Sequence, residues 1–173
     1  MHILRNLAFT CAALLSSSAA LADQPPGTRP AAEVFFAFDS ARLPDGAWRQ
    51  LAGLVEWSAR HPYAKIVIDG HTDTTGSDVY NIGLSSRRAA RVQAKLIALG
   101  VPADRIYRSV YGEDDVHRAT PNQDRRVTIW TTEESLSALI RHSLVRGTAV
   151  LWNSPVTAAE IDGRQSTTVA AAP

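Results

Sequence analysis

The chain has 173 residues, of which 45% are hydrophobic, and its 18 Lys and Arg nearly balance its 17 Asp and Glu. This length and composition predict one globular domain with short extensions. Near-neutral charge argues against a broad nucleic-acid or anionic-membrane surface, which requires an excess of basic residues on one face.

The first 22 residues have the pattern of a secretory signal peptide. Arg5 supplies the positive start and residues 7–15 form a mostly apolar stretch. Ala20-Leu21-Ala22 matches the small-residue cleavage pattern, so we expect cleavage before Asp23. A membrane anchor is disfavoured, because a bilayer span needs roughly 20 apolar residues. Cys11, the only cysteine, lies in the apolar stretch after residues that fit a lipobox poorly. We therefore expect a secreted periplasmic chain with no lipid anchor, transmembrane segment or disulfide.

Two strands and one helix are predicted next. Residues 23–32 contain three prolines and indicate an extended lead-in. The aromatic run at 34–38 and the apolar run within 65–69 each indicate a buried strand. Between these runs, Pro44 and Asp45 favour a helix start. The apolar positions of this helix are Trp48, Leu51, Ala52 and Val55, and its end is expected at His61-Pro62.

The polar segment 70–83 is expected to contain only a short helical turn. Ser85 is a plausible N-cap for the next helix, and Gly100 followed by Pro102 would end it. Its apolar face consists of Ala89, Val92, Leu96 and Leu99. Two more strands are indicated at 106–111 and 126–131. The order strand, helix, strand, helix, strand, strand predicts an α/β (α+β sandwich) fold, a mixed sheet with helices packed on one face.

A further helix is predicted beyond this core. Residues 133–146 place Leu136, Leu139, Ile140 and Leu144 on one stripe, which favours a helix packed on the domain, with a partner-binding helix as the alternative. The composition after residue 152 indicates a disordered tail. The expected organisation is a signal peptide (1–22), a lead-in (23–32), one domain (33–131), a helical extension (132–152) and the tail (153–173).

The most informative motif is Gly70-His71-Thr72-Asp73, followed by Tyr80-Asn81 and then Ser85-Ser86-Arg87-Arg88-Ala89. Together with Phe38-Asp39-Ser40 before it and Asp124-Arg125-Arg126-Val127 after it, this motif strongly resembles the signature of OmpA-like C-terminal domains. The resemblance runs from about residue 34 to residue 130. Several spaced blocks in one order are far more specific than a lone motif.

This resemblance implies noncovalent peptidoglycan binding, without catalysis or a cofactor. The ligand of the family is the diaminopimelate of the stem peptide, whose side chain ends in an ammonium and a carboxylate. Matched by position, Asp73 would take the ammonium and Arg88 the carboxylate. Asn81 and Arg125 match further contacts, and Thr72 and Asp39 are weaker candidates.

The same resemblance implies that the protein anchors an envelope component to the cell wall, in the periplasm and in association with the outer membrane. An alternative is an interaction subunit of a secretion, motor or outer-membrane complex, which would contact its partner through residues 132–173.

The position of Arg88 in the predicted helix is an independent reason to expect an anion beside it. A helix capped by Ser85 would place Arg87 and Arg88 in its first turn, where the helix dipole disfavours a cation by roughly 0.3–1 kcal/mol. An anion is therefore expected beside them, and a ligand carboxylate there would meet free helix N–H groups and a guanidinium fork. Alternatively, Asp73 or Asp78 supplies this anion internally.

Other chemistries have less support. His71 and Asp73 are two potential metal ligands without a third, so no metal is expected. Ser85 and Ser86 lack an identifiable base and orienting acid, so we expect no catalytic residues and no enzymatic activity. Asp39 and Asp124 could each cap a turn, and Tyr80 is assigned to core or loop packing.

Overall fold

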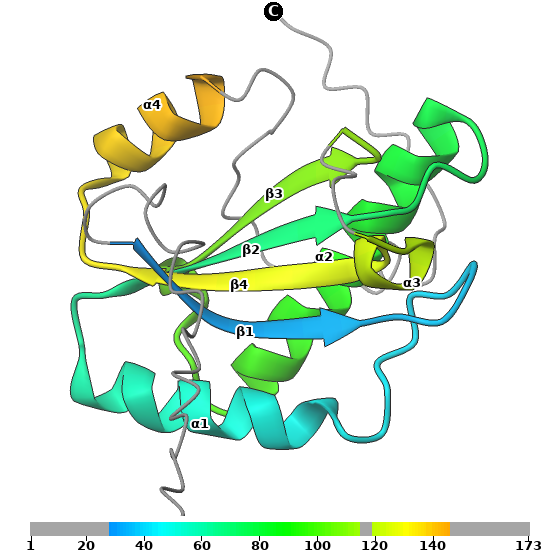
Figure 1. The fold of residues 1–173 in the computed structure, drawn as a ribbon. Helices are drawn as coiled ribbons and strands as arrows, with labels where there is room; N and C mark the ends of the chain where they lie inside the picture. The colour runs from blue at the N-terminus through cyan, green and yellow to red at the C-terminus, as the bar shows by residue number, and fades with distance from the viewer. Residues whose placement is uncertain (1–27, 115–118, 146–173) are drawn as a thin grey trace, which may run out of the picture.

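The computed structural model describes residues 28–114 and 119–145, which form a single four-stranded sheet with helices (Figure 1). The predicted signal peptide (1–22), the tail (153–173) and the end of the extension (146–152) lie outside the described residues. In chain order the elements are β1 (Thr28–Phe35), α1 (Ala47–Arg60), β2 (Lys65–His71), α2 (Asp78–Ala98), the 3-10 turn η1 (Ala103–Arg105), β3 (Ile106–Gly112), α3 (Pro121–Asp124), β4 (Arg126–Thr132) and α4 (Leu136–Val145).

The sheet mixes parallel and antiparallel pairs in the order β1-β4-β2-β3. β2 and β3 are parallel, because α2 carries the chain back between them. β4 lies antiparallel to both β1 and β2. The predicted α/β fold with a mixed sheet is therefore confirmed.

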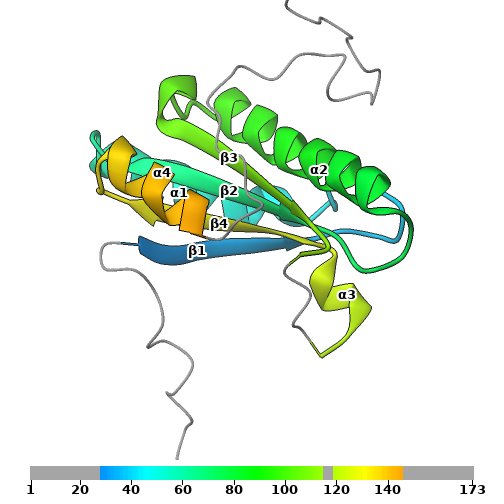
Figure 2. The same ribbon diagram turned by 90° about the horizontal axis from the view of Figure 1, so that it is seen from above.

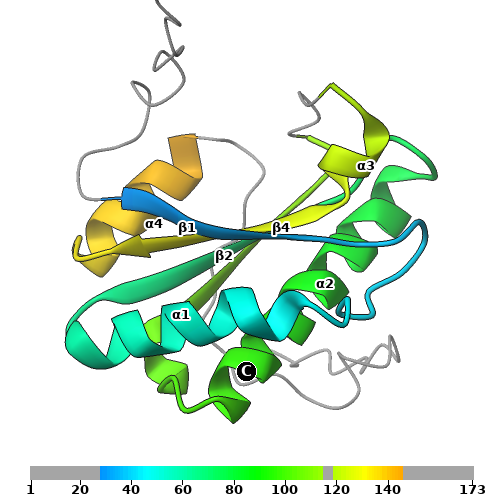
Figure 3. The same ribbon diagram turned by 60° about the horizontal axis from the view of Figure 1, so that its bottom comes forward.

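The core lies between the sheet and the two long helices. Figure 2 shows α2 running along β2 and β3, and Figure 3 shows α1 and α2 on one side of the sheet with α4 on the other. Side chains alternate between the two faces of a strand, so Ile66 and Ile68 of β2 point into this core. The other central members are Val34, Leu51, Leu54, Ala89, Val92, Leu96, Ile106, Val127 and Ile129.

β1 begins earlier than predicted and also ends earlier. It pairs with β4 from Thr28↔Thr132 to Phe35↔Arg126, with a register shift near Pro30. A proline can lie here because β1 is an edge strand. The first part of this strand was assigned mainly to the extended lead-in, because the prolines of residues 23–32 are unfavourable in a strand.

α1 also differs from its prediction. It begins at Ala47, so Pro44 and Asp45 precede the helix, although its end at His61 is as expected. Leu51 and Leu54 are buried, whereas Trp48 is 51% exposed. Trp48 was therefore wrongly assigned to the apolar face.

The start of α2 is the main correction to the predicted elements. The helix begins at Asp78, and its N-cap is Ser77, whose hydroxyl accepts from the Tyr80 backbone N–H. Ser85 lies buried inside the helix, where its hydroxyl donates to the Ile82 carbonyl. The predicted end is right, since Gly100 follows the helix with φ +103°.

α4 is present as predicted. Leu139 is buried, while Leu136 and Ile140 stay exposed, so both packing on the domain and partner binding stay open for this helix. Within residues 28–114 and 119–145, no helix combines the length and apolar character that a bilayer crossing requires.

Candidate functional site

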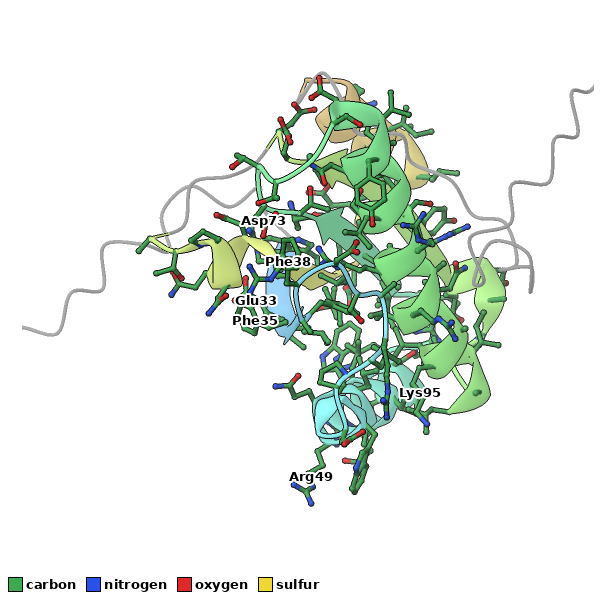
Figure 4. The ribbon with its side chains drawn as sticks, turned by 90° about the vertical axis from the view of Figure 1, so that its right-hand side faces the viewer. Glu33, Phe35, Phe38, Arg49, Asp73 and Lys95 are labelled. Atoms are coloured by element: carbon green, nitrogen blue, oxygen red, sulfur yellow. The ribbon has the colours of Figure 1, made fainter. Side chains whose placement is uncertain are left out.

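A cleft of about 200 Å³ opens where the loop after β1, the β2–α2 loop and the start of α2 meet. Figure 4 shows Phe38 and Asp73 together on this side of the molecule, whereas Arg49 and Lys95 lie away from it. The residues that line the cleft are Phe38, Asp39, Asp73, Thr75, Gly76, Tyr80, Leu84, Arg88 and Arg125. Four of the six predicted binding residues are among them.

Arg88 is a buried cation in the lining of the cleft. Its residue exposure is 0%, and its guanidinium donates to the carbonyls of Ser40 (2.9 Å), His71 (2.9 Å) and Ala37 (3.3 Å). Burial lowers the pKa of Arg88 to about 10, with Asp73 opposing the shift, so the group stays charged at neutral pH. Two of its five N–H bonds are left by these contacts.

The Arg88 guanidinium makes no ion pair with any carboxylate in the described part of the chain. Carbonyl dipoles offset part of the cost of burying this charge, but they do not neutralise it. Neither carboxylate considered as an alternative, internal anion makes an ion pair with Arg88: Asp78 is exposed, and Asp73 acts only at longer range.

The predicted position of Arg88 in the first turn of a helix is wrong. Because α2 begins at Asp78, Arg87 and Arg88 lie well beyond its first turn, where the helix dipole is weak. The free N–H groups of the helix start are also not beside Arg88. Burial without a paired carboxylate creates the demand for an anion instead.

Asp73 lines the same cleft as Arg88 but is paired with Arg125. One carboxylate oxygen accepts from Arg125 Nη1 at 2.9 Å, and the other accepts from the Thr75 backbone N–H at 3.1 Å. Arg125 also donates to the Phe36 carbonyl and to Asn122 Oδ1. The Asp73 carboxylate is thus held in a fixed position, with only 6% of the residue exposed.

Asp39 and Tyr80 meet at the side of the cleft. The Tyr80 hydroxyl donates to Asp39 Oδ1, and this hydrogen bond raises the pKa of Tyr80. Asp39 has φ +51°, a left-handed conformation that aspartate tolerates better than most residues. The contact links the loop after β1 to the start of α2.

Sequence reasoning missed Tyr80 as a site residue. Tyr80, Leu84 and Arg88 all line the cleft and are spaced by four residues, so they lie on one face of α2. This spacing would have revealed the stripe if the helix start had been placed at Ser77.

Thr72 and Asn81 lie beneath the cleft and do not line it. Asn81 is 1% exposed, and its Nδ2 donates to the Asp73 carbonyl at 3.3 Å and to Glu113 Oε2 at 2.6 Å. The Thr72 backbone N–H donates to the Gly112 carbonyl at 2.7 Å. The Asn81 side chain and the Thr72 backbone therefore support the site without lining it.

The described residues contain no group of three or more His, Cys, Asp or Glu side chains placed to hold a metal ion. His71 stacks on Tyr111, with ring centroids 5.0 Å apart. The Ser85 hydroxyl accepts from the Gly112 backbone N–H as well as donating to Ile82, so its role in this arrangement is structural.

This fold is that of a known class of domain. The family model described as "OmpA family" matches residues 35–129, and the chain belongs to that family. Among curated relatives, it is 36% identical over 81 residues to the peptidoglycan-associated lipoprotein of Brucella melitensis, covering 47% of this chain and 48% of the relative. It is 37% identical over 81 residues to outer membrane porin F of Pseudomonas fluorescens, covering 47% of this chain and 25% of the porin.

A solved structure supports the same assignment. The peptidoglycan-associated lipoprotein of Burkholderia pseudomallei aligns with a TM-score of 0.55 and 28% identity, covering 58% of this chain and 89% of that one. The match to curated lipoprotein relatives spans about half their length.

Proposed function

We propose that this domain binds peptidoglycan noncovalently, through the diaminopimelate of the stem peptide, and so anchors an envelope component to the cell wall. Membership of the OmpA family and the names of the lipoprotein relatives support the wall as the target. The observation that carries the ligand assignment is Arg88, a buried guanidinium that lines the cleft without a paired carboxylate.

The charges of the cleft suit a zwitterion. Asp39 and Asp73 contribute two carboxylates, and Arg88 and Arg125 contribute two guanidiniums, so the lining is balanced. A side chain that ends in both an ammonium and a carboxylate would place the carboxylate on the free N–H bonds of Arg88. Its ammonium would share the Asp73 carboxylate with Arg125.

The expected affinity of one site is modest. Charge-assisted hydrogen bonds contribute roughly 1.5–3 kcal/mol each, while association costs several kcal/mol. Two or three such bonds therefore give weak single-site binding. Retention on the wall would come from the high local density of stem peptides.

We propose a binding role without catalysis, located in the periplasm. The envelope relatives support the compartment. Among the described residues, the cleft lining includes no serine, cysteine or histidine side chain that could act as a nucleophile or base. Release of soluble muropeptides from purified sacculi by the protein would contradict this part of the proposal.

The ligand assignment is tested by calorimetric titration with three matched stem peptides. One carries diaminopimelate, the second carries diaminopimelate with its side-chain carboxylate amidated, and the third carries lysine, which has the ammonium alone. We expect the first to bind about tenfold or more tightly than the others, because only its carboxylate meets Arg88.

Two variants complete the test. Asp73→Asn should weaken binding of the diaminopimelate peptide, because the ammonium loses its counter-charge. Asp78→Asn removes an exposed carboxylate outside the cleft lining and should leave binding unchanged. Equal affinity for all three peptides would overturn the assignment of Arg88.

A further inference from the structure

Glu113, the residue after β3, has a contact that the proposed binding chemistry does not use. It does not line the cleft, yet its Oε2 accepts from Asn81 Nδ2 at 2.6 Å. The same Asn81 nitrogen donates to the main-chain carbonyl of Asp73 at 3.3 Å. Glu113, Asn81 and Asp73 thus form a chain of polar contacts that ends at the carboxylate-bearing residue of the site.

The backbone brings Glu113 to this position. Gly112 has φ +59°, and a Cβ there would lie 3.3 Å from the Ile82 nitrogen, so the turn fits closely against the first part of α2. The Gly112 N–H donates to Ser85 Oγ at 3.2 Å, and its carbonyl accepts from Thr72. The backbone just before Glu113 is therefore held by α2 through Ser85 and by the loop after β2 through Thr72.

The chemistry of the amide explains what Glu113 does. An Asn side chain can turn about its last bond, which exchanges its donor nitrogen and acceptor oxygen. A carboxylate and a carbonyl both accept hydrogen bonds, so the turned form of Asn81 would set oxygen against oxygen at both contacts. Glu113, through the shorter of the two contacts, accordingly adds to the stability of the form in which Asn81 donates to the Asp73 carbonyl.

We infer that Glu113 is a positioning residue of the binding cleft: through Asn81 it holds the main chain of Asp73, and with it the Asp73 carboxylate, in the place that receives the ligand ammonium. The role of the ligand in this inference rests on the proposed function. The hold on the loop does not, because its contacts exist without any ligand.

The first measurement needs no ligand. The Thr75 N–H donates to the Asp73 carboxylate, so its amide hydrogen exchange, followed by NMR, reports on the loop. Glu113→Ala should speed this exchange by about tenfold, in line with the loss of a hydrogen bond to a charged group. Asp114→Ala removes the same charge at the exposed neighbouring position and should leave the exchange unchanged. Unchanged exchange in Glu113→Ala would overturn the inference.

Two conservative variants separate the hydrogen bond from the charge. Glu113→Gln is neutral but keeps an acceptor of the same reach, whereas Glu113→Asp keeps the charge on a shorter side chain. We expect Glu113→Gln to keep slow Thr75 exchange and Glu113→Asp to lose it. The reverse order would mean that Glu113 acts through its charge, which contradicts a positioning role. These variants also decide the question if Glu113→Ala does not fold.

The second measurement is affinity for the diaminopimelate peptide. Glu113→Ala should weaken binding about five- to tenfold, and should have no further effect in a chain that already carries Asn81→Ala, because the two residues act in series. Additive losses would contradict action through Asn81. If the unaltered protein does not bind the peptide, the proposed function fails, and the exchange measurement still decides the role of Glu113.

Discussion

At the scale of single residues, the cleft depends on the buried Arg88 side chain, which holds the surrounding backbone and presents its remaining N–H bonds in a fixed direction. The Arg88 guanidinium binds the carbonyls of Ala37 and Ser40 in the loop after β1, and that of His71 at the end of β2. These bonds fix the planar group, so its remaining N–H bonds have a set direction before any ligand arrives. Preorganisation of this kind lowers the entropy cost of binding.

Arg88→Lys tests whether stability and ligand affinity depend on the planar guanidinium of Arg88 as well as on its positive charge. A lysine ammonium is a point charge on a flexible stem and cannot reproduce three directed bonds to separate carbonyls. We expect the free energy of unfolding, measured by urea denaturation, to fall by about 2 kcal/mol. Affinity for the diaminopimelate peptide should fall about tenfold or more, because bidentate capture of the carboxylate is lost.

Arg87→Lys provides the matched control for this substitution. Arg87 is next in sequence and lies over the Tyr80 ring, but it does not line the cleft. A lysine there keeps the cation, so stability and affinity should both stay near those of the unaltered protein. Normal binding by Arg88→Lys would show that charge alone recognises the carboxylate.

At the scale of elements, the site depends on how closely α2 approaches β2. A Cβ built on Gly70 would lie 2.4 Å from the Ser85 carbonyl oxygen in the backbone of α2. The absence of a side chain at Gly70 therefore allows the helix to sit directly on the strand end. This approach places the Arg88 side chain within reach of the His71 carbonyl.

Gly70→Ala should separate these two elements. The clash is with backbone and not with a flexible side chain, so α2 must shift, and we expect a loss of about 3 kcal/mol in unfolding free energy. Gly53→Ala, on the exposed face of α1 with nothing within 4 Å of the added Cβ, should instead raise stability by about 0.5–1 kcal/mol. A stable Gly70→Ala protein with normal ligand affinity would contradict this account.

The same helix shows where sequence patterns stop being informative. The strands at 65–69, 106–111 and 126–131 were found because they are rich in β-branched and aromatic residues, which favour strands. Residues 78–84, the first part of α2, were missed because Asn81 on its buried face is polar while Val79 and Ile82 are exposed, which removes the apolar periodicity that marks a helix. Asn81 donates to the Asp73 carbonyl next to the cleft, so the residue that hid the start of the helix also supports the site.

At the scale of the whole molecule, the site is assembled from segments that are distant in the sequence. Family resemblance placed Asp73, Arg88, Arg125 and Asp39 at one cleft, and the structure brings these four together. The pairing of Asp73 with Arg125 rather than Arg88 could not be read from the chain, because it depends on how α3 delivers Arg125 to the end of β2. The contact of Glu113 with Asn81 could not be read from the chain either, because it joins residues that only the fold brings together.

Charge balance across the whole molecule leads to a prediction about salt. The chain is nearly neutral and its cleft pairs two carboxylates with two guanidiniums, so binding a zwitterion releases few counterions. A protein that neutralises a polyanion through six to ten contacts loses about 10³–10⁵ in affinity between roughly 50 and 200 mM salt. Here we expect a loss of less than about threefold over that range, because partly buried ion pairs are weakly screened.

The measurement is a calorimetric titration of the diaminopimelate peptide at several salt concentrations, repeated as a pull-down on purified sacculi. A shallow dependence in both would mean that the wall is held by the cleft and not by diffuse attraction to its anionic polymers. A steep dependence with sacculi but a shallow one with the peptide would locate most of the retention outside the cleft. Because each cleft would hold one zwitterionic end of the wall at a time, firm attachment through the clefts alone would require many copies along the surface, each exchanging rapidly.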